Sequence, residues 1–377
     1  MIKKKIVFLT ATRADFGKLK PLIGKIENSK FFECNIFATG MHALSKYGNT
    51  IREIKKERYK NIYAYINQND TDKMDIILSN TILGFSHYIS ELCPDMIVVH
   101  GDRIEALAGA IVGSLNNILV SHIEGGEISG TIDETLRHAI TKLSHIHFVS
   151  NVKAKKRLIQ LGEKSSNVFE IGSPDIDIML LKNLPSLESL KKRYNINFNS
   201  YAIFIYHPVT TELDKLNNNI INVVSALIQS NKNYIVLYPN NDIGSDIILK
   251  EFERIKNKPN FRILPSMRFE YFLTLLKNSN FIIGNSSAGI REAPVYGVLT
   301  INIGTRQHGR SINRQIINVN EKVDDILQII KNSDNKKVDS LKEFGEGNSC
   351  EKFYKILLDN NIWKISPQKM FIDIDEV

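Results

Sequence analysis

The sequence predicts an α/β protein made of two doubly wound domains, and two observations lead to this fold class. The first is the length of 377 residues, because about 100–200 residues are typical of one domain and each half can bury a sizeable core. The second is the alternation of short apolar runs with longer amphipathic stretches. Strands that alternate with helices favour βαβ units and parallel sheets.

The first half contains six short runs, rich in Ile, Val and Phe, that we expect to be buried strands. They are Lys5–Thr10, Cys34–Thr39, Asp95–Val99, Ile118–His122, Ile146–Val149 and Val168–Ile171. Between the second and third runs, from Asp72 to Leu92, apolar residues recur at helical spacing and predict an amphipathic helix.

After Pro174 the pattern loosens, and we expect a linker near residues 174–200. Five further strands are expected at Tyr201–Tyr206, Tyr234–Tyr238, Phe261–Leu264, Phe281–Ile283 and Leu299–Ile303. The expected domains are residues 1–174 and 175–349, with a loop at 332–349 before a last helix that begins near Cys350. Ligands of doubly wound domains bind beyond the carboxyl ends of the strands, so we expect a ligand cleft between the domains.

The composition narrows the function. A net charge of +8 arises from 49 Lys and Arg against 41 Asp and Glu, but the basic clusters Lys3–Lys5, Lys153–Arg157 and Lys191–Arg193 are expected to be solvated faces. No pattern indicates nucleic-acid binding, no run approaches the ~18–20 apolar residues of a membrane span, and three isolated cysteines favour the cytoplasm. Without a GxGxxG, GxxxxGK[ST], HExxH or GxSxG motif, we expect no nicotinamide cofactor and no metal.

Two strand ends carry candidate anion-binding and acidic groups. After the first strand, Arg13 lies in the turn and Lys18 in the following helix, which forms a natural anion site; alternatively, Asp15 caps the helix and Arg13 is a surface residue. After the strand DMIVV come Asp102 and Arg103. Asp102 is a candidate functional residue, or else the N-cap of a helix over Arg103–Leu115.

The segment HIEGGEISGTIDETLRHAITK, residues 122–142, is the richest in chemistry. Thr131 and Glu134 form a capping box, which leaves three other acids to explain: Glu124, Glu127 and Asp133. Asp133 and Arg137 have the spacing of an ion pair along a helix. Acids around a glycine-rich strand end favour general acid–base chemistry, because mutual repulsion and burial tune their pKa values.

The second half carries a candidate phosphate site. In FIIGNSSAGIREAPVYG, residues 281–297, Ser286 is either a helix N-cap or, with Ser287, part of a phosphate cradle at a helix start, before Pro294 interrupts the helix. Arg306 follows the next strand. His207 follows the strand at 201–206 and is the best placed of the nine histidines.

Seven segments together closely resemble the hydrolysing UDP-N-acetylglucosamine 2-epimerases of bacterial sialic acid synthesis and the epimerase domain of the bifunctional animal enzyme. They are TRADFGKLKPL, VVHGDR, HIEGGEISGTIDETLRHAITKLSH, HPVTTE, YPNND, GNSSAGIREA and GTRQHGR. The HIEGGE and IDE segments replace the HVEAGLR and PEE-type segments of the non-hydrolysing relatives. The resemblance implies two Rossmann-like domains of the glycosyltransferase-B type, with the C-terminal helix, about 350–377, packed back on the first domain and UDP bound by the second.

The resemblance also implies roles for single residues. Asp102, Glu124 and Asp133 match the catalytic acids, with His207 near the phosphate and sugar. Residues expected on the diphosphate are Arg13, Arg103, Ser286, Ser287 and Arg306, with Lys18 a weaker candidate. Glu292 is expected on the ribose and Asn240 and the backbone near Met267 at the nucleotide end, while Glu127 and Arg137 complete the expected substrate site.

The implied reaction converts UDP-N-acetylglucosamine and water to N-acetylmannosamine and UDP, the first step of sialic acid synthesis. It would proceed by elimination to 2-acetamidoglucal and rehydration in a homodimer or homotetramer. One alternative is a hydrolysing 2-epimerase for UDP-2,4-diacetamido-2,4,6-trideoxyglucose, of the legionaminic acid type. Another is a UDP-sugar glycosyltransferase, which would explain the UDP site but not the acids at 124–133.

Overall fold

The structure, a computed structural model, describes residues 3–44, 48–129, 132–181, 184–240, 242–307, 315–333 and 338–373. The chain divides into two compact units. Unit 1 contains Met1–Glu127, Asp133–Leu180 and Glu343–Val377, and unit 2 contains Ile128–Ile132 and Leu181–Lys342. These divisions fall a few residues away from the expected bounds at 174 and 349, because α7 (Pro174–Met179) packs on α1 (Arg13–Glu27) within unit 1.

Unit 1 is built on a seven-stranded sheet in the order β3-β2-β1-β4-β5-β6-β7, with every neighbouring pair parallel. The strands are β1 (Lys4–Thr10), β2 (Phe32–Ala38), β3 (Asn61–Ala64), β4 (Met96–His100), β5 (Leu119–Ile123), β6 (Ile146–Val149) and β7 (Val168–Glu170). Its other helices are α2 (Ile51–Lys56), α3 (Met74–Leu92), α4 (Ile104–Leu115), α5 (Ile132–Leu143), α6 (Val152–Gln160) and α14 (Ser349–Leu358). Short 3-10 turns lie at Gly40–Ala43, Ser165–Asn167 and Ile362–Lys364.

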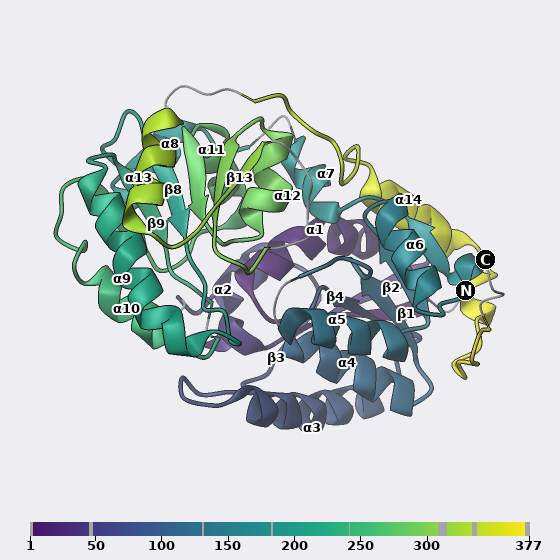
Figure 1. The fold of residues 1–377 in the computed structure, drawn as a ribbon. Coiled ribbons are helices and arrows are strands. Elements are labelled where there is room, and N and C mark those ends of the chain that lie inside the picture. Colours follow the sequence, from purple (N-terminus) through teal and green to yellow (C-terminus); the bar gives the residue numbers. More distant parts are fainter. Residues whose placement is uncertain are drawn as a thin grey trace. The chain divides into compact units, whose positions relative to one another are not determined.

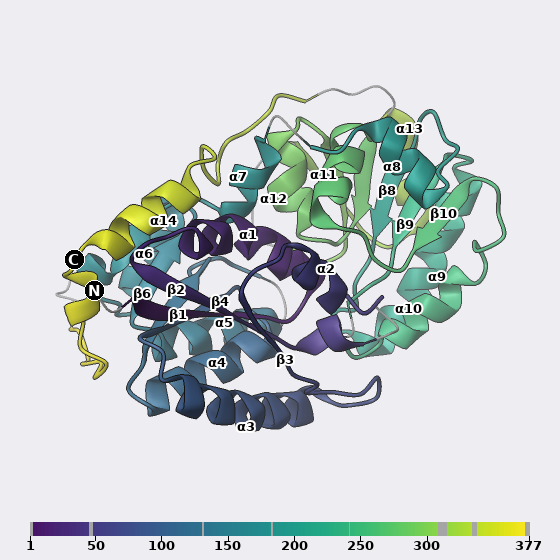
Figure 2. The same cartoon turned by 180° about the vertical axis from the view of Figure 1, so that it is seen from behind.

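Alternate side chains of the strands build a separate core on each face of this sheet. On β1, Ile6 and Phe8 pack with α1 and α14, whereas Val7 and Leu9 pack with α3 and α4. Both ribbon views show α1 and α14 on one face and α3 and α4 on the other (Figures 1 and 2). A strand buried on both faces is typical of parallel sheets, which explains why the sequence shows continuous apolar runs.

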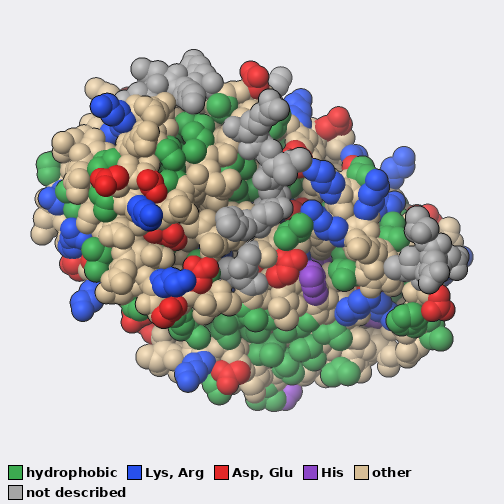
Figure 3. Space-filling view, in the orientation of Figure 1, with side chains coloured by type: hydrophobic (Ala, Val, Ile, Leu, Met, Phe, Trp, Pro, Cys, Tyr) green, Lys and Arg blue, Asp and Glu red, His purple; other side chains and the backbone are tan. Residues whose placement is uncertain are grey.

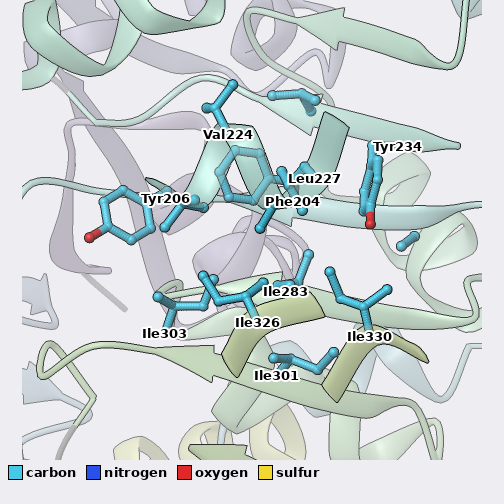
Figure 4. Packing of buried hydrophobic residues seen from close by; sticks show 14 of the residues in the cluster. Phe204, Tyr206, Val224, Leu227, Tyr234, Ile283, Ile301, Ile303, Ile326 and Ile330 are labelled. Atoms are coloured by element: carbon cyan, nitrogen blue, oxygen red, sulfur yellow. The ribbon is translucent and has the colours of Figure 1, made fainter. Parts of the chain in front are cut away.

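Unit 2 has a six-stranded parallel sheet in the order β10-β9-β8-β11-β12-β13. The strands are β8 (Ala202–Ile205), β9 (Tyr234–Leu237), β10 (Phe261–Leu264), β11 (Phe281–Gly284), β12 (Leu299–Ile303) and β13 (Ile316–Val319). The helices are α8 (Leu187–Tyr194), α9 (Leu213–Gln229), α10 (Ser245–Phe252), α11 (Phe269–Lys277), α12 (Ala288–Val295) and α13 (Val323–Asn332). In Figure 4, Phe204 of β8 lies among Val224 and Leu227 of α9, and Ile326 and Ile330 of α13 belong to the same core.

The predicted fold class, two doubly wound α/β domains, is confirmed, and the predicted strands lie where they were expected. Two strands, β3 and β13, were not predicted. Both lie at sheet edges, where most of their residues are partly or fully exposed. The expected ligand cleft between the domains stays a prediction.

The expected C-terminal helix is shorter than predicted. It packs on α1 in unit 1 but ends at Leu358, because the Asp-Asn-Asn run that follows favours a turn. The chain then continues without regular structure beyond Lys364, where Lys369 Nζ donates to Ser144 O and Glu163 at 2.7 and 2.5 Å. Among the described residues, no helix is long and apolar enough to cross a bilayer.

Candidate functional site

The strand order changes direction between β1 and β4 in unit 1 and between β8 and β11 in unit 2. At such a switch point the loops after two neighbouring strands diverge, and ligands of open α/β sheets bind there. Arg13, Asp102 and Arg103 follow β1 and β4, whereas His207 and Ser286 follow β8 and β11. The predicted residues therefore lie at both switch points.

Arg13 is the first residue of α1, directly after β1. Thr12 is the N-cap, and it forms a capping box with Asp15, whose carboxylate accepts from Thr12 N at 2.9 Å. The N-cap is Thr12 and not Asp15, which instead takes part in the capping box from the third position of the helix. Further along α1, Lys18 is nearly buried and its Nζ lies 3.1 Å from the buried Asp175 Oδ2 of α7. Lys18 therefore has a structural partner in unit 1.

Asp102 lies in the turn between β4 and α4. The alternative that Asp102 caps this helix is wrong, because α4 begins at Ile104 and its N-cap is Arg103, which makes no side-chain cap bond. Asp102 Oδ2 instead accepts a hydrogen bond from Arg137 of α5, whose guanidinium is 2% exposed. Arg137 also donates to Glu127 O at 3.1 Å. A buried guanidinium thus links the loops that follow β4 and β5.

Glu124 is the first residue after β5, and its φ of 66° is in the left-handed region that non-glycine residues rarely adopt. His100 Nε2 lies 3.1 Å from one carboxylate oxygen, and Ser173 Oγ donates to the other. Three residues later, Glu127 accepts from Ser150 Oγ. These contacts bring two of the three predicted acids of this segment into hydrogen-bonded positions.

Asp133 lies in the first turn of α5, four residues before Arg137. Glu134 follows it, with its carboxylate 4.0 Å from Arg137 Nη1 and 3.1 Å from His138 Nε2. The predicted capping box depends on Thr131, which lies outside the described residues.

A buried, neutral histidine supports the turn that carries Asp102. Burial lowers the pKa of His122 to about 3. The Nε2 atom of His122 lies 2.8 Å from Gly101 O and its Nδ1 lies 3.3 Å from Thr141 Oγ1. Because Gly101 has a φ of 71°, the turn needs glycine, and the histidine fixes its carbonyl.

In unit 2, Asn285 joins the two loops of the switch point. Its Oδ1 accepts from His207 N at 2.7 Å and its Nδ2 donates to His207 O at 2.8 Å. The Nδ1 atom of His207 accepts from Asn240 N at 3.1 Å, so a neutral His207 carries its proton on Nε2. The loops after β8, β9 and β11 are therefore held together by short polar contacts.

The helix after β11 begins one residue later than expected. Ser287, not Ser286, is the N-cap of α12, and its side chain makes no cap bond. Ser286 Oγ accepts from Ala288 N at 3.3 Å. Pro294 lies in the last turn of α12 and does not interrupt the helix. Gly284 has a φ of 126°, and a Cβ there would lie 1.9 Å from Ile205 O, so the chain needs glycine at the entrance to this loop.

The other predicted residues of unit 2 lie after neighbouring strands or on α12. Glu292 is buried on α12, and Arg306 follows β12 with its Nη1 donating to Asn285 O at 3.3 Å. Met267 is buried between β10 and α11. Gln307 Nε2 also donates to Asn285 O, at 2.8 Å. The loop after β11 is thus bordered by serine hydroxyls, helix N–H groups and a guanidinium, which is a suitable environment for an anion.

Three residues of these sites were not predicted as functional: His100, Ser173 and Asn285. His100 and Asn285 each directly follow or end a strand, which is a signal that could have singled them out. Ser173 follows β7, whose run was predicted, but its contact with Glu124 depends on the pairing of separate strands. No group of three His, Cys, Asp or Glu side chains that could hold a metal occurs among the described residues.

On the face shown in Figure 3, Lys and Arg side chains are interspersed with Asp and Glu. Two members of the cluster Lys153–Arg157 have contacts within unit 1: Arg157 Nη1 donates to Gly126 O at 3.1 Å, and Lys153 Nζ lies 3.7 Å from Glu343 Oε1. The other two lysine runs lie at the start of β1 and on α8.

Comparisons with known proteins show similarity in sequence and in fold. The family model of UDP-N-acetylglucosamine 2-epimerase matches residues 24–358. A UDP-N-acetylglucosamine 2-epimerase of Neisseria meningitidis serogroup B is 45% identical over 99% of this chain and 100% of that protein. A UDP-N,N'-diacetylbacillosamine 2-epimerase (hydrolyzing) of Legionella pneumophila is 34% identical over 94% of this chain and 95% of that protein.

A solved structure supports the fold. The crystal structure of UDP-GlcNAc 2-epimerase from Neisseria meningitidis bound to UDP-GlcNAc superposes with a TM-score of 0.81 at 18% identity, covering 94% of this chain and 100% of that one. At this identity the likeness concerns the fold. The family model and both relatives match nearly the whole chain, and we conclude that this chain belongs to the UDP-N-acetylglucosamine 2-epimerase family.

Proposed function

We propose that this protein is a hydrolysing UDP-N-acetylglucosamine 2-epimerase, which converts UDP-N-acetylglucosamine and water to N-acetylmannosamine and UDP. The observation that carries the proposal is a pair of hydrogen-bonded carboxylates, the buried Glu124 and the partly exposed Asp102, at the carboxyl edge of the sheet of unit 1. A transferase that moves an intact sugar keeps the proton on carbon 2 and needs a base only for the hydroxyl of its acceptor. A 2-epimerase needs groups that remove and return a proton.

Guanidinium groups and serine hydroxyls are assigned to the leaving UDP. Arg13, Arg103, Ser286, Ser287 and Arg306 are assigned to the diphosphate, where guanidinium groups and helix N–H groups stabilise developing negative charge. Lys18 is the weaker candidate, because Asp175 already pairs with it.

The remaining groups would orient the nucleotide and the sugar. Glu292 is assigned to the ribose hydroxyls and Asn240 with the backbone at Met267 to the nucleotide end. His207 is assigned to the phosphate and sugar, and its Nε2–H can donate because Nδ1 accepts from Asn240 N. Glu127 and Arg137 border the sugar.

The proposed reaction starts with cleavage of the bond between carbon 1 and the phosphate oxygen. The proton on carbon 2 lies next to no carbonyl, so it becomes acidic only as positive charge develops at carbon 1. A carboxylate, Asp102 or Glu124, takes this proton, the C–H electron pair forms the double bond of 2-acetamidoglucal, and the C–O pair leaves with UDP. Donors around the diphosphate supply the electrostatic stabilisation.

Hydration then completes the reaction. Asp133 or a neighbouring acid accepts a proton from water as its oxygen bonds to carbon 1, while a proton is delivered to the opposite face of carbon 2. The sugar product carries one added water, and UDP departs with the oxygen of the cleaved bond. Free N-acetylmannosamine is the result.

The hydrolysing branch is favoured by the HIEGGE and IDE segments and by the name of the Legionella relative. That relative also favours a second candidate substrate, a UDP-2,4-diacetamido-2,4,6-trideoxyhexose. The higher identity to the Neisseria enzyme, 45% against 34%, places UDP-N-acetylglucosamine first. A homodimer or homotetramer, a cytoplasmic location and a role in sialic acid synthesis stay predictions.

The test is incubation with UDP-N-acetylglucosamine in D₂O, followed by NMR. Free N-acetylmannosamine deuterated at carbon 2, together with UDP, is the expected result. UDP-N-acetylmannosamine as product would show the non-hydrolysing reaction instead. If the trideoxy substrate alone is converted, the second candidate replaces the first.

A further inference from the structure

Glu124 is held in a backbone conformation that is costly for its residue type. Its φ is 66°, and a non-glycine residue persists in this sparsely populated region only where the surrounding structure enforces it. The amide of Glu124 donates to Phe148 O of β6 at 2.9 Å. This bond and the side-chain contacts fix the direction in which the carboxylate leaves β5.

Each oxygen of the carboxylate has its own donor, and the donors come from different strands. His100, the last residue of β4, places Nε2 at 3.1 Å from Oε2. Ser173 follows β7 and donates from Oγ to Oε1. Glu124 and Ser173 are buried, and only 9% of the His100 side chain is exposed.

Ser173 is available for this contact because its side chain does not cap the helix that it precedes. It is the N-cap residue of α7, yet it makes no side-chain cap bond. A serine at an N-cap normally accepts from the backbone of the first turn. At this position the hydroxyl of Ser173 instead donates a hydrogen bond to the carboxylate of Glu124.

The position of Ser173 is set by the segment that returns to unit 1 near the C-terminus. Ser173 N donates to Phe344 O at 2.7 Å, and Ser349 Oγ donates to Ser173 O at 3.0 Å. Gly345 has a φ of 133°, and a Cβ on it would lie 3.1 Å from Gly172 Cα. Residues about 170 positions away in sequence thus hold the serine in place.

We propose that His100 and Ser173 are positioning residues that hold Glu124 as an oriented carboxylate for proton transfer. The inference rests on the proposed function, in which Glu124 moves a proton. Hydrogen bonds donated to a carboxylate favour its charged form over the neutral acid. The two donors therefore stabilise the proton-accepting state and hold the plane of the carboxylate in one orientation.

Other ionisable groups surround this pair on the neighbouring elements. They are His122 on β5, Asp102 after β4 with Arg137 on α5, and Asp175 on α7 with Lys18 on α1. His122 stays neutral, and the two acids have cationic partners. Removal of a donor to Glu124 should therefore appear in the pH profile as an effect on Glu124 itself.

The experiment compares four variants of the full chain. His100→Ala and Ser173→Ala each delete a donor, whereas His100→Gln keeps an N–H near the position of Nε2. Ser144→Ala is the matched control, because Ser144 is also buried in unit 1 and its hydroxyl donates to Ile140 O at 2.7 Å, away from Glu124. Fluorescence of Trp363, the single tryptophan and a residue of unit 1, reports folding of each variant.

For the two donor deletions we expect kcat to fall about 10–100-fold, with KM within about threefold of the wild type, because orientation and not substrate binding is lost. The midpoint of the acid limb of the kcat–pH profile should rise, and His100→Gln should recover most of the rate. Equal losses in Ser144→Ala, an unmoved acid limb or a dominant effect on KM would overturn the proposal. A wild-type chain that converts no UDP-sugar would overturn the proposed function as well, which separates the two failures.

Discussion

The carboxyl edges of the two sheets are stabilised in different ways. In unit 1, the carboxylates of the edge bond to other side chains, as Asp102 does to Arg137 and Glu124 to His100 and Ser173. In unit 2, edge side chains bond mainly to the backbone. The Asn285 side chain accepts from the amide of His207 and donates to its carbonyl, and Arg306 donates to the carbonyl of Asn285.

This difference indicates what each edge can do. Bonds between ionisable side chains fix their charge and direction, which proton transfer requires. Bonds from side chains to the backbone fix the shape of loops, which keeps hydroxyls and N–H groups ready for an anion. Substitutions at the edge of unit 1 should therefore change kcat, and those at the edge of unit 2 should change nucleotide affinity and stability.

The largest effect is expected from neutralising the acids of unit 1. In Glu124→Gln and Asp133→Asn, kcat should fall about 10²–10⁴-fold, because a general acid or base is lost, while the Kd for UDP stays within about threefold. The measurements are steady-state kinetics and calorimetric titration with UDP. Glu170→Gln, at an exposed position of β7, is the control. Near-normal turnover in either variant would remove that acid from the mechanism.

The next effect concerns the backbone contacts of unit 2. Asn285→Ala leaves the amide and carbonyl of His207 without their buried partners. An unsatisfied buried polar group costs about 1–3 kcal/mol. The free energy of opening of β8 and β11, measured by amide hydrogen exchange, should therefore fall by about 3 kcal/mol. Asn280→Ala is the control, because among the described residues the side chain of Asn280 bonds only to the hydroxyl of Ser200, at an exposed site. Equal protection in both variants would contradict the role of Asn285.

The sequence predicted the central strands because burial on both faces demands continuous apolar runs. It did not predict the edge strands β3 and β13, most of whose residues are partly or fully exposed. The region near 174–200 was expected to be a linker, yet its first part is the buried helix α7. Asp177 of α7 accepts from Ser349 N and Cys350 N at 2.9 and 2.7 Å, a contact across 172 residues or more that no local pattern shows.

The candidate site was predicted to a similar extent. Strand ends located Asp102, Glu124 and His207, because parallel strands bring their carboxyl ends to one edge. Partners were harder to predict, since the contact of Ser173 with Glu124 depends on strands β5, β6 and β7 being adjacent. The alternatives based on helix capping were wrong by one residue at Asp102 and Ser286, because the N-caps are Arg103 and Ser287.

A smaller effect should separate charge from geometry in unit 2. In Arg306→Lys the charge remains but the planar fork is lost, so the Kd for UDP should rise about 10–100-fold, as expected for one charge-assisted hydrogen bond of about 1.5–3 kcal/mol. Calorimetric titration measures this. Arg262→Lys is the matched control, because Arg262 lies on β10 and its Nε donates to the backbone carbonyl of Tyr194 at 2.7 Å. Equal changes in the two variants would refute the assignment of Arg306 to the diphosphate.

The smallest effect is a pH dependence of stability that arises in unit 1. Burial lowers the pKa of His122 to about 3 in the folded chain, whereas an unfolded histidine has a pKa of about 6.5. Below pH 6.5 the unfolded state therefore binds a proton that the folded state does not, so stability is lost as the pH falls. His42, whose pKa burial lowers to about 4, acts in the same direction.

When the pH falls from 7.5 to 5.5, His122 should lower the free energy of unfolding of unit 1 by about 1.4 kcal/mol, the equivalent of one pKa unit. In His122→Gln this part of the loss should disappear, although the variant is less stable at pH 7.5 if the contact with Gly101 O weakens. Urea unfolding followed by the fluorescence of Trp363 measures unit 1 alone, because that residue packs on Phe32 of β2. His87→Gln, on the exposed side of α3, should keep the wild-type pH dependence. If His122→Gln keeps it too, the acid sensitivity of unit 1 comes from its other buried histidines and the neutral His122 does not contribute.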